Sequence, residues 1–319
     1  VAKDIAYIII LALVGCAFAG PSTLNRIVGG EDTTIDKYPF MVNMQYAIIG
    51  TAWTQYCGGS LLTTRAVLSA AHCFEGDIPT FWRAVLGSTY ATSGFGGSFH
   101  PVSEFILHPQ YNTPTMDNNV AIVRLSVPAV YSNTVQPARI AGRNYNLPDG
   151  TQVISIGWGA YAYDTWWPEL LQHVDINVIN HGVCAWRYMF LKMEPGFEGW
   201  PDITAGMLCA GILDEGGKGA CKLDCGGPLV HQADVVVGIT SWSYKCADAH
   251  YPGVYTRVSQ YTDWITTTIV IITILYNIKL IGCRYCFEFF FGIHSLSLIF
   301  FYTFHSLVSS QVSTLILLH

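Results

Sequence analysis

The chain has 319 residues, of which 51% are hydrophobic and 12% are charged, and its formal net charge at pH 7 is −6. The 16 basic residues are outnumbered by 22 acidic ones and form no stripe, which excludes a protein that neutralises nucleic-acid phosphates. The low charge, together with 30 glycines and 18 tyrosines, also excludes a disordered chain and a coiled coil.

Residues 1–19 have the pattern of a secretory signal peptide, with a short polar start, an apolar run and small residues at the end. Ala17 and Ala19 flank a phenylalanine, a pattern typical of a signal-peptidase cleavage site. A membrane helix is the alternative, but the apolar run of residues 5–14 is shorter than the ~20 residues that a span requires. We therefore expect a secreted protein.

The middle of the chain has the pattern of an all-β protein. Residues 27–265 carry 12 basic and 20 acidic residues, a net charge of −8. Their short β-type runs are separated by glycine, proline and asparagine. The clearest runs are residues 66–69, 120–125, 152–156 and 235–242. Helical periodicity is nearly absent before the end, where Ser259 is a candidate N-cap. This pattern predicts a β-barrel or a β-sandwich.

Seven cysteines lie in the same region. Behind a signal peptide, cysteines usually form disulfides, and an odd number leaves one thiol unpaired. Their number does not identify which thiol that is. The seven are Cys57, Cys73, Cys184, Cys209, Cys221, Cys225 and Cys246.

The last segment, residues 266–319, contains no alanine, proline, aspartate or tryptophan and is crowded with phenylalanine, isoleucine, leucine, serine and threonine. Residues 289–319 carry no formal charge and are long enough for a membrane anchor. Their residue types also have A- and T-rich codons, and neither strand alternation nor a heptad pattern organises them. We favour translation of untranslated RNA past a lost stop codon over an anchor.

Several motifs of the middle region resemble those of the chymotrypsin-like serine proteases, and especially of insect midgut trypsins. The RIVGG of an activation site, the AAHC of a catalytic-histidine block and a CGGP nucleophile loop occur in the family's order. The matching segments are residues 26–30, 57–61, 68–73, 117–125, 221–229, 241–242 and 251–257. Their combination makes this resemblance highly specific.

The resemblance implies two six-stranded antiparallel β-barrels, divided near residues 131–140, with the active site between them and a short C-terminal helix. It implies an activation peptide of residues 20–26, removed by an activating protease that cleaves after Arg26, so that the new amine of Ile27 pairs with Asp224. The histidines of this region show no metal-ligand spacing, so we expect no metal or other cofactor. The resemblance also implies the disulfides Cys57–Cys73, Cys184–Cys209 and Cys221–Cys246, which leaves Cys225 as the free thiol.

The catalytic positions depart from the family pattern. The base is present as His72, but Asn119 occupies the position of the aspartate that fixes the histidine tautomer. Asparagine carries no charge to stabilise an imidazolium, and its amide can hold the ring in the wrong tautomer. Asp117 shares a strand face with Asn119, but ~6.6 Å of strand separates them, too far for it to act as a substitute.

The nucleophile loop departs as well. Cys225 occupies the position of the serine, and Leu223 occupies the position of the glycine that shares the oxyanion hole with the nucleophile. Loss of one oxyanion donor costs about 2.7–4 kcal/mol of transition-state stabilisation. Papain-like proteases use a cysteine, a histidine and an asparagine, the residue types found here at Cys225, His72 and Asn119. A thiol protease is therefore a second interpretation.

The primary specificity pocket has changed in the same way. Gly219 occupies the floor position where trypsins have aspartate. One wall position, usually glycine, is Ser243, and the other, Gly253, is retained. Such a pocket cannot pair with lysine or arginine, so we expect it to accept neutral or apolar side chains.

These departures favour a secreted protease homologue that has lost efficient peptidase activity and acts by binding peptides, proteins or protease inhibitors in its cleft. An active serine-type or Cys225 thiol endopeptidase that cleaves after neutral or apolar residues is the alternative. A membrane-anchored form is a third hypothesis, and it depends on residues 289–319 alone.

Overall fold

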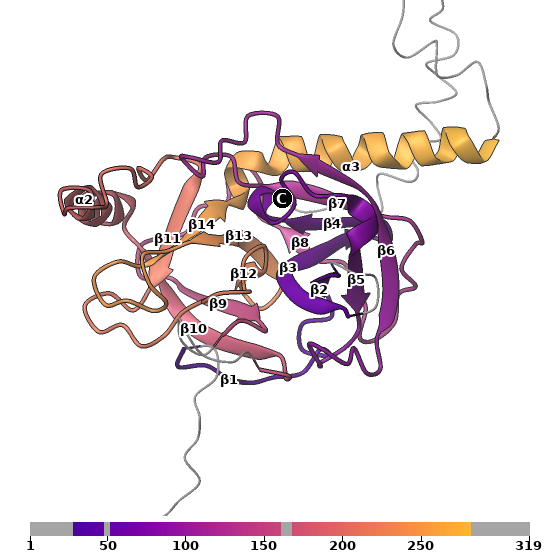
Figure 1. Cartoon of the computed structure of the whole chain (residues 1–319), viewed down its shortest axis with the longest axis horizontal. Coiled ribbons are helices and arrows are strands. Elements are labelled where there is room, and N and C mark those ends of the chain that lie inside the picture. The colour runs from indigo at the N-terminus through magenta and orange to yellow at the C-terminus, as the bar shows by residue number, and fades with distance from the viewer. Residues whose placement is uncertain (1–27, 48–51, 161–167, 282–319) are drawn as a thin grey trace, which may run out of the picture.

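The computed structural model describes residues 28–47, 52–160 and 168–281, whose strands form two barrels side by side (Figure 1). The first barrel closes in the order β2-β3-β4-β7-β6-β5. Its strands are β2 (Met41–Tyr46), β3 (Thr54–Thr63), β4 (Ala66–Ser69), β5 (Trp82–Leu86), β6 (Ser98–Leu107) and β7 (Ala121–Leu125).

The second barrel has the order β9-β10-β11-β14-β13-β12 and closes because β12 pairs with β9. Two short strands, β1 (Glu31–Asp32) and β8 (Arg139–Ile140), pair with its outside at β10 and β13. The barrel strands are β9 (Gln152–Gly157), β10 (Gln172–Ile179), β11 (Met207–Gly211), β12 (Pro228–His231), β13 (Val235–Trp242) and β14 (Gly253–Arg257). The predicted fold of two six-stranded antiparallel barrels is therefore confirmed.

Alternation of apolar and polar side chains explains why these segments form strands. In β10, Val174, Ile176 and Val178 are buried, whereas Asp175 and Asn177 between them are exposed. The predicted strands at residues 66–69 and 235–242 coincide with β4 and β13. Those at residues 120–125 and 152–156 differ from β7 and β9 by one residue at one end.

One helix escaped the sequence analysis. Helix α2 (His181–Leu191) lies at the far end of the second barrel (Figure 1) and begins after Asn180, whose side chain accepts a hydrogen bond from the Val183 N–H at 3.0 Å. It buries only the narrow face of Cys184, Tyr188 and Leu191. The outer face is also largely apolar, so the sequence shows little helical periodicity there.

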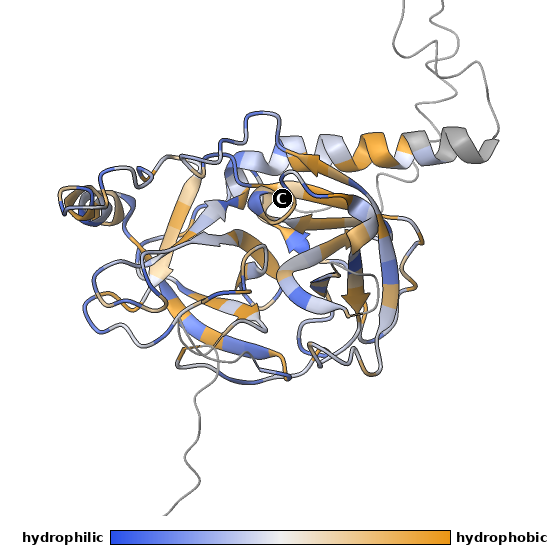
Figure 2. Cartoon of the chain, viewed as in Figure 1, coloured by the Kyte–Doolittle hydropathy of each residue, from blue (hydrophilic) through white to orange (hydrophobic). Residues whose placement is uncertain are grey.

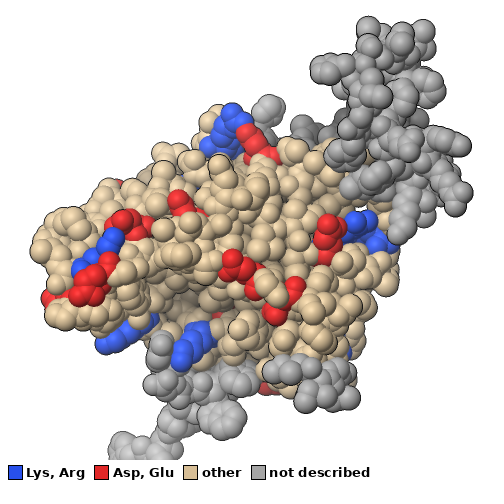
Figure 3. Space-filling model, turned by 45° about the horizontal axis from the view of Figure 1, so that its top comes forward, with Lys and Arg blue, Asp and Glu red and all other residues tan. Residues whose placement is uncertain are grey.

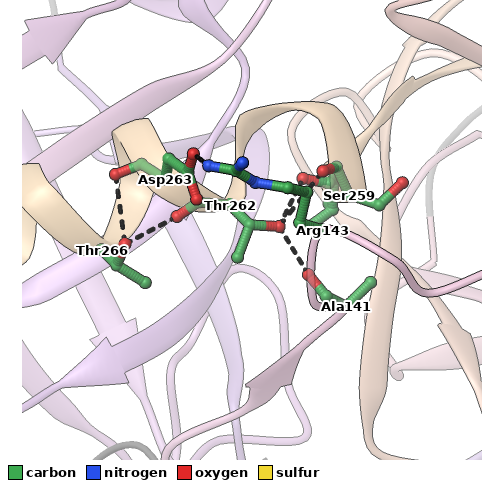
Figure 4. A network of polar contacts seen from close by, with 7 residues as sticks. Ala141, Arg143, Ser259, Thr262, Asp263 and Thr266 are labelled. Carbon is green, nitrogen blue, oxygen red and sulfur yellow. Dashed lines mark hydrogen bonds and ion pairs between the residues drawn. The ribbon is translucent and has the colours of Figure 1, made fainter. Parts of the chain in front are cut away.

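The C-terminal helix α3 (Val258–Ile281) starts at the end of β14 and runs across the first barrel (Figure 1). Its first turns are tied to the segment between the barrels (Figure 4). The Thr262 hydroxyl donates to the Ala141 carbonyl at 2.7 Å, and Arg143 forms an ion pair with Asp263. Thr266 donates back to the Thr262 carbonyl at 2.9 Å.

The helix continues past Ile265, where we expected the protease domain to end. Ile272 is only 4% exposed, and Ile269 packs against the same core. Further on, the Arg65 guanidinium donates to the Tyr276 hydroxyl at 3.0 Å and lies 4.0 Å from the centre of its ring. Figure 2 shows the apolar stretch of α3 beside the first barrel.

The first part of residues 266–319, in which the sequence analysis found no pattern, is therefore a helix that packs against the barrels. The contacting residues Ile265, Ile269, Ile272 and Tyr276 follow one another at intervals of four, three and four, which is helical spacing. No helix in the described part of the chain is long and apolar enough to cross a membrane. Residues 1–19 and 289–319, and the hypotheses about them, lie outside the described residues.

The three disulfides implied by the family resemblance are present, and Cys225 is the free thiol of the described residues. The two barrels approach each other closely beside this thiol. The Gly58 N–H of β3 donates to the Cys225 carbonyl at 2.8 Å, and a Cβ at Gly58 would lie 2.8 Å from the Gly227 Cα. Only glycine at position 58 permits this approach.

Candidate active site

His72 and Asn119 meet where the first barrel faces the second. His72 lies in a short 3₁₀ helix (Ala71–Cys73), which the Cys57–Cys73 disulfide ties to β3. Asn119 is completely buried two residues before β7. Its Oδ1 accepts the backbone N–H of His72 at 2.9 Å, and its Nδ2 lies 2.8 Å from His72 Nδ1. The structure therefore brings these two predicted site residues together.

The orientation of the Asn119 amide is fixed by its other partners. If the amide were turned over, its NH₂ group would face the His72 N–H, and two donors would meet. In the observed orientation Nδ2 also lies 2.7 Å from the Ser241 hydroxyl, which can accept from it. Since Nδ2 can only donate, His72 Nδ1 must accept, and the proton of a neutral ring therefore resides on Nε2.

The second barrel holds Asn119 from its other side. The Thr256 hydroxyl of β14 donates to the Asn119 carbonyl at 2.7 Å. Ser241 and Thr256 are separated from Asn119 by 122 and 137 residues, so no local signal could identify them as its partners. Asp117 accepts a hydrogen bond from Thr204 at 2.7 Å, and no hydrogen bond within the described residues joins it to His72.

Burial lowers the pKa of His72 below its ordinary value, and the hydrogen bond with Asn119 opposes this effect only in part. The ring is therefore uncharged at neutral pH. A neutral imidazole with its proton on Nε2 has no free lone pair on that atom, so it cannot take a proton from a neighbouring nucleophile there.

The Cys225 thiol lies in the loop before β12, and its Sγ is 3.7 Å from the Ser241 carbonyl oxygen. Burial in the first place, and the nearby Asp224 carboxylate in the second, raise the pKa of Cys225 to about 12. The thiol is consequently protonated at neutral pH. Within the described residues no hydrogen bond joins it to His72.

Leu223, at the predicted oxyanion position, has a backbone φ of +72°. This left-handed conformation favours glycine and costs other residues about 1–3 kcal/mol. The carbonyl of Leu223 accepts a hydrogen bond from the Gln55 side chain of β3 at 2.8 Å. The loop therefore has a glycine-like backbone with a leucine side chain, held by a buried glutamine that the sequence analysis did not single out.

Asp224 is almost fully buried, and its carboxylate accepts the backbone N–H groups of Gly159 at 2.7 Å and Cys221 at 2.9 Å. A Cβ at Gly157 or Gly159 would lie 2.1–2.2 Å from this carboxylate, so both positions require glycine. Burial raises the pKa of Asp224 to about 7, although both hydrogen bonds act in the opposite direction.

The predicted partner of Asp224, the amine of Ile27, precedes the described part of the chain, which begins at Val28. The first described residue, Val28, already lies beside the site, because its carbonyl accepts the Gly219 N–H at 3.1 Å. Gly29 follows with a φ of +69°, and a Cβ there would lie 2.2 Å from the Gly217 carbonyl oxygen. The pairing of Ile27 with Asp224 stays a prediction.

Next to the thiol lies a cavity of about 200 Å³. Of the three predicted pocket residues, Ser243 and Gly253 line it, whereas Gly219 is buried against Val28 and does not. The complete lining consists of Ala220, Cys221, Lys222, Cys225, Thr240, Ser241, Trp242, Ser243, Lys245, Cys246, Gly253, Val254 and Tyr255. It contains two lysines and no carboxylate.

The comparisons with known proteins agree with the fold. The family model described as Trypsin matches residues 27–265. Trypsin CFT-1 of Choristoneura fumiferana is 45% identical over 259 residues, which are 80% of this chain and 97% of that protein. Alkaline trypsin C of Manduca sexta is 43% identical over 260 residues, with the same shares covered. The vitellin-degrading protease of Bombyx mori is 36% identical over 260 residues, 82% of this chain and 92% of that protein.

The family model covers most of the chain, and the relatives match over nearly their whole lengths. Together with the two barrels and the three disulfides, these matches identify the family. The chain belongs to the trypsin family of chymotrypsin-like serine proteases and is close to insect trypsins.

Proposed function

We propose that this trypsin-family protein has no efficient peptidase activity and acts by binding peptide segments in its cleft. The observation that carries the proposal is the hydrogen bond from the Asn119 amide to His72 Nδ1, because it fixes the ring with its proton on Nε2. The general base of this family needs the opposite tautomer.

The size of this effect is known for the family. In a well-studied member, the same aspartate-to-asparagine exchange lowers turnover about 10⁴-fold, a value measured on that enzyme rather than obtained from this structure. The nucleophile adds a second obstacle. Because its pKa is raised to about 12, the Cys225 thiol is protonated at pH 7 and is a weak nucleophile.

The environments of Cys225 and His72 do not favour the thiolate–imidazolium pair that a thiol protease requires. A papain-like site activates its cysteine through a thiolate–imidazolium pair, which needs a low thiol pKa and a protonated ring. Here burial raises the pKa of Cys225 and lowers that of His72, so both groups favour their neutral forms. These protonation states support peptide binding without turnover.

The setting that we propose follows from the sequence. Residues 1–19 direct secretion into an extracellular space such as the gut lumen, and three disulfides suit an oxidising compartment. An activating protease cleaves after Arg26. Peptides or protein protease inhibitors, which present a peptide segment to the cleft, are the partners.

Hydrolysis of a peptide mixture tests the proposal. Protein cleaved after Arg26 is incubated with peptides in which every residue type precedes a peptide bond, and mass spectrometry records the products. We expect no cleavage above that of a His72→Ala variant. The matched control combines Asn119→Asp, Leu223→Gly and Cys225→Ser, which restores the family residues and gains activity. Rapid cleavage by the unaltered protein would refute the proposal.

A further inference from the structure

Helix α2 carries a stripe of exposed apolar side chains on its outward face, at the far end of the second barrel (Figure 1). These side chains are 39–72% exposed, and none of them lines the pocket beside Cys225. They follow one another at intervals of three, three, one and three residues, which is the spacing of one helix face. An exposed apolar patch of this kind marks an interaction site. The stripe consists of Val183, Trp186, Met189, Phe190 and Met193.

The opposite face of α2 is fixed to the second barrel. Cys184 forms the disulfide with Cys209 of β11, and the Tyr188 hydroxyl donates to the Pro252 carbonyl at 2.7 Å. The stripe is therefore a preformed surface. A partner that docks on it does not have to order the helix, so that entropy cost is avoided.

The charged side chains that border the stripe are paired with opposite charges. On one side, Arg187 forms an ion pair with Asp214 at 2.8 Å. On the other side, Lys192 forms an ion pair with Asp202 at 2.6 Å. Figure 3 shows basic and acidic side chains next to one another at the end of the molecule where α2 lies. Both basic groups are thus engaged within the protein, whereas membrane-surface helices use lysines and arginines to attract anionic lipids.

The stripe is complementary to a second copy of itself. In an antiparallel pair of helices related by a two-fold axis, Trp186 of one copy faces Phe190 of the other. By the same symmetry Val183 faces Met193, because both pairs have the same midpoint along the helix. The Trp186 and Phe190 ring centres lie 4.4 Å apart within one copy, so the pair of helices brings four aromatic rings together.

The charges agree with this symmetry. No charged residue belongs to the stripe, so no like charges meet at the axis. Each border contains one basic and one acidic side chain. Two identical borders that meet about the axis therefore offer opposite charges to each other.

We propose that the protein forms a two-fold symmetric dimer in which the α2 helices of two copies pack antiparallel through their stripes. Five side chains of this size and exposure offer on the order of 500 Å² per copy. The contact then buries on the order of 1,000 Å² in total, at the lower limit of specific interfaces, so association is reversible and weak. The pocket beside Cys225 lies outside the contact, and the dimer does not depend on the proposed function.

Sedimentation equilibrium of the full chain between about 1 and 200 μM tests the dimer. We expect a reversible monomer–dimer equilibrium within this range. Phe190→Glu should weaken the dimer at least about 30-fold, because it places two like charges near the two-fold axis. Phe95→Glu is the matched control, since it makes the same exchange at a side chain of the first barrel that is 76% exposed, and it should leave the dimer unchanged.

A mixture of two variants tests the antiparallel register. Trp186→Lys and Phe190→Glu should each be monomeric alone. In an equimolar mixture the introduced lysine of one copy faces the introduced glutamate of the other, so a heterodimer should form. Both side chains are exposed in the natural protein, so both variants should fold, and recovery of a dimer in the mixture demonstrates that they do.

The outcomes separate the possible partners of the stripe. A monomer at about 200 μM, a dimer unaffected by Phe190→Glu, or equal weakening by Phe95→Glu would overturn the proposal. A dimer that both stripe variants abolish and the mixture does not recover would overturn the antiparallel register. Sedimentation of the monomer with phosphatidylcholine vesicles, abolished by Phe190→Glu, would assign the stripe to a lipid surface instead. None of these results depends on whether the protein cleaves peptides.

Discussion

The side-chain amide of Asn119 determines which ring nitrogen of His72 carries the proton. Asn119 has four polar neighbours, and each matches one of its donors or acceptors: the His72 N–H, the His72 ring, Ser241 and Thr256. An aspartate could accept the first of these hydrogen bonds equally well. It differs at the ring, where it would accept from Nδ1 and not donate to it.

Measuring which ring nitrogen of His72 carries the proton therefore tests the orientation of the Asn119 amide directly. We expect ¹⁵N NMR to show an unprotonated Nδ1 in the natural protein and a protonated Nδ1 in the Asn119→Asp variant, because a carboxylate accepts where the amide donates. A His72→Gln variant assigns the signals. Ser241→Ala is the control, since the His72 N–H alone still orients the amide. A protonated Nδ1 in the natural protein at neutral pH would contradict the assignment.

The Cys225 thiol should react slowly. Because burial raises its pKa to about 12, the thiolate population, and with it the rate of alkylation by iodoacetamide, should rise about tenfold per pH unit above neutrality. At pH 7 the rate should be far below that of a free cysteine, and unfolding should remove the difference. Labelling near neutral pH as fast as that of a catalytic thiol would be inconsistent with this environment.

At the scale of the element, α3 extends beyond the end that the sequence analysis expected. Its second half contacts the first barrel through Tyr276, which packs against Arg65, although β14, from which the helix starts, belongs to the second barrel. The helix therefore connects the two barrels on the side where Ala141 and Arg143 also contact it (Figure 4).

Two adjacent isoleucines of α3 provide a matched test. Ile272→Ala should lower the free energy of unfolding by about 2–4 kcal/mol, because the side chain is buried against the core. Ile271→Ala should change it by less than about 0.5 kcal/mol, because Ile271 is 50% exposed. Urea unfolding of the full chain measures both values. Equal effects would show that this part of the helix is not packed.

Much of the architecture could be predicted because it is encoded locally. The strands β4 and β13 follow from apolar runs, and the positions of His72, Asn119 and Cys225 follow from short motifs. The orientation of the Asn119 amide could not be predicted, since Ser241 becomes its neighbour only when the second barrel has folded. Likewise, Lys222 and Lys245 lie beside cysteines of one disulfide, but only the cavity reveals that both line the pocket.

At the scale of the whole molecule, the buried Asp224 makes stability depend on pH. Its pKa is about 7 in the folded chain, against an ordinary value of 3.8. Between these values the folded protein binds more protons than the unfolded chain, so the free energy of unfolding falls as pH rises, by up to about 4 kcal/mol. Above pH 7 this contribution is constant.

If the new Ile27 amine pairs with Asp224, cleavage after Arg26 should abolish the fall in the free energy of unfolding with rising pH. The reason is that an ion pair lowers the pKa of the carboxyl. The cleaved and uncleaved forms should differ little in thermal stability near pH 4, and the cleaved form should be the more stable above pH 7. An Arg26→Gln variant treated with the same protease is the control. Identical pH profiles of the two forms would argue against the pairing.

The way Asn119 is embedded has an evolutionary consequence. The oxygen that supports the His72 backbone is common to asparagine and aspartate, and so is the carbonyl held by Thr256. These two hydrogen bonds therefore do not distinguish the two residues, whereas the contact with His72 Nδ1 does. A lineage that no longer needs peptide hydrolysis can therefore exchange aspartate for asparagine at this position and keep both hydrogen bonds. Other residues of the cleft can then change to bind new ligands.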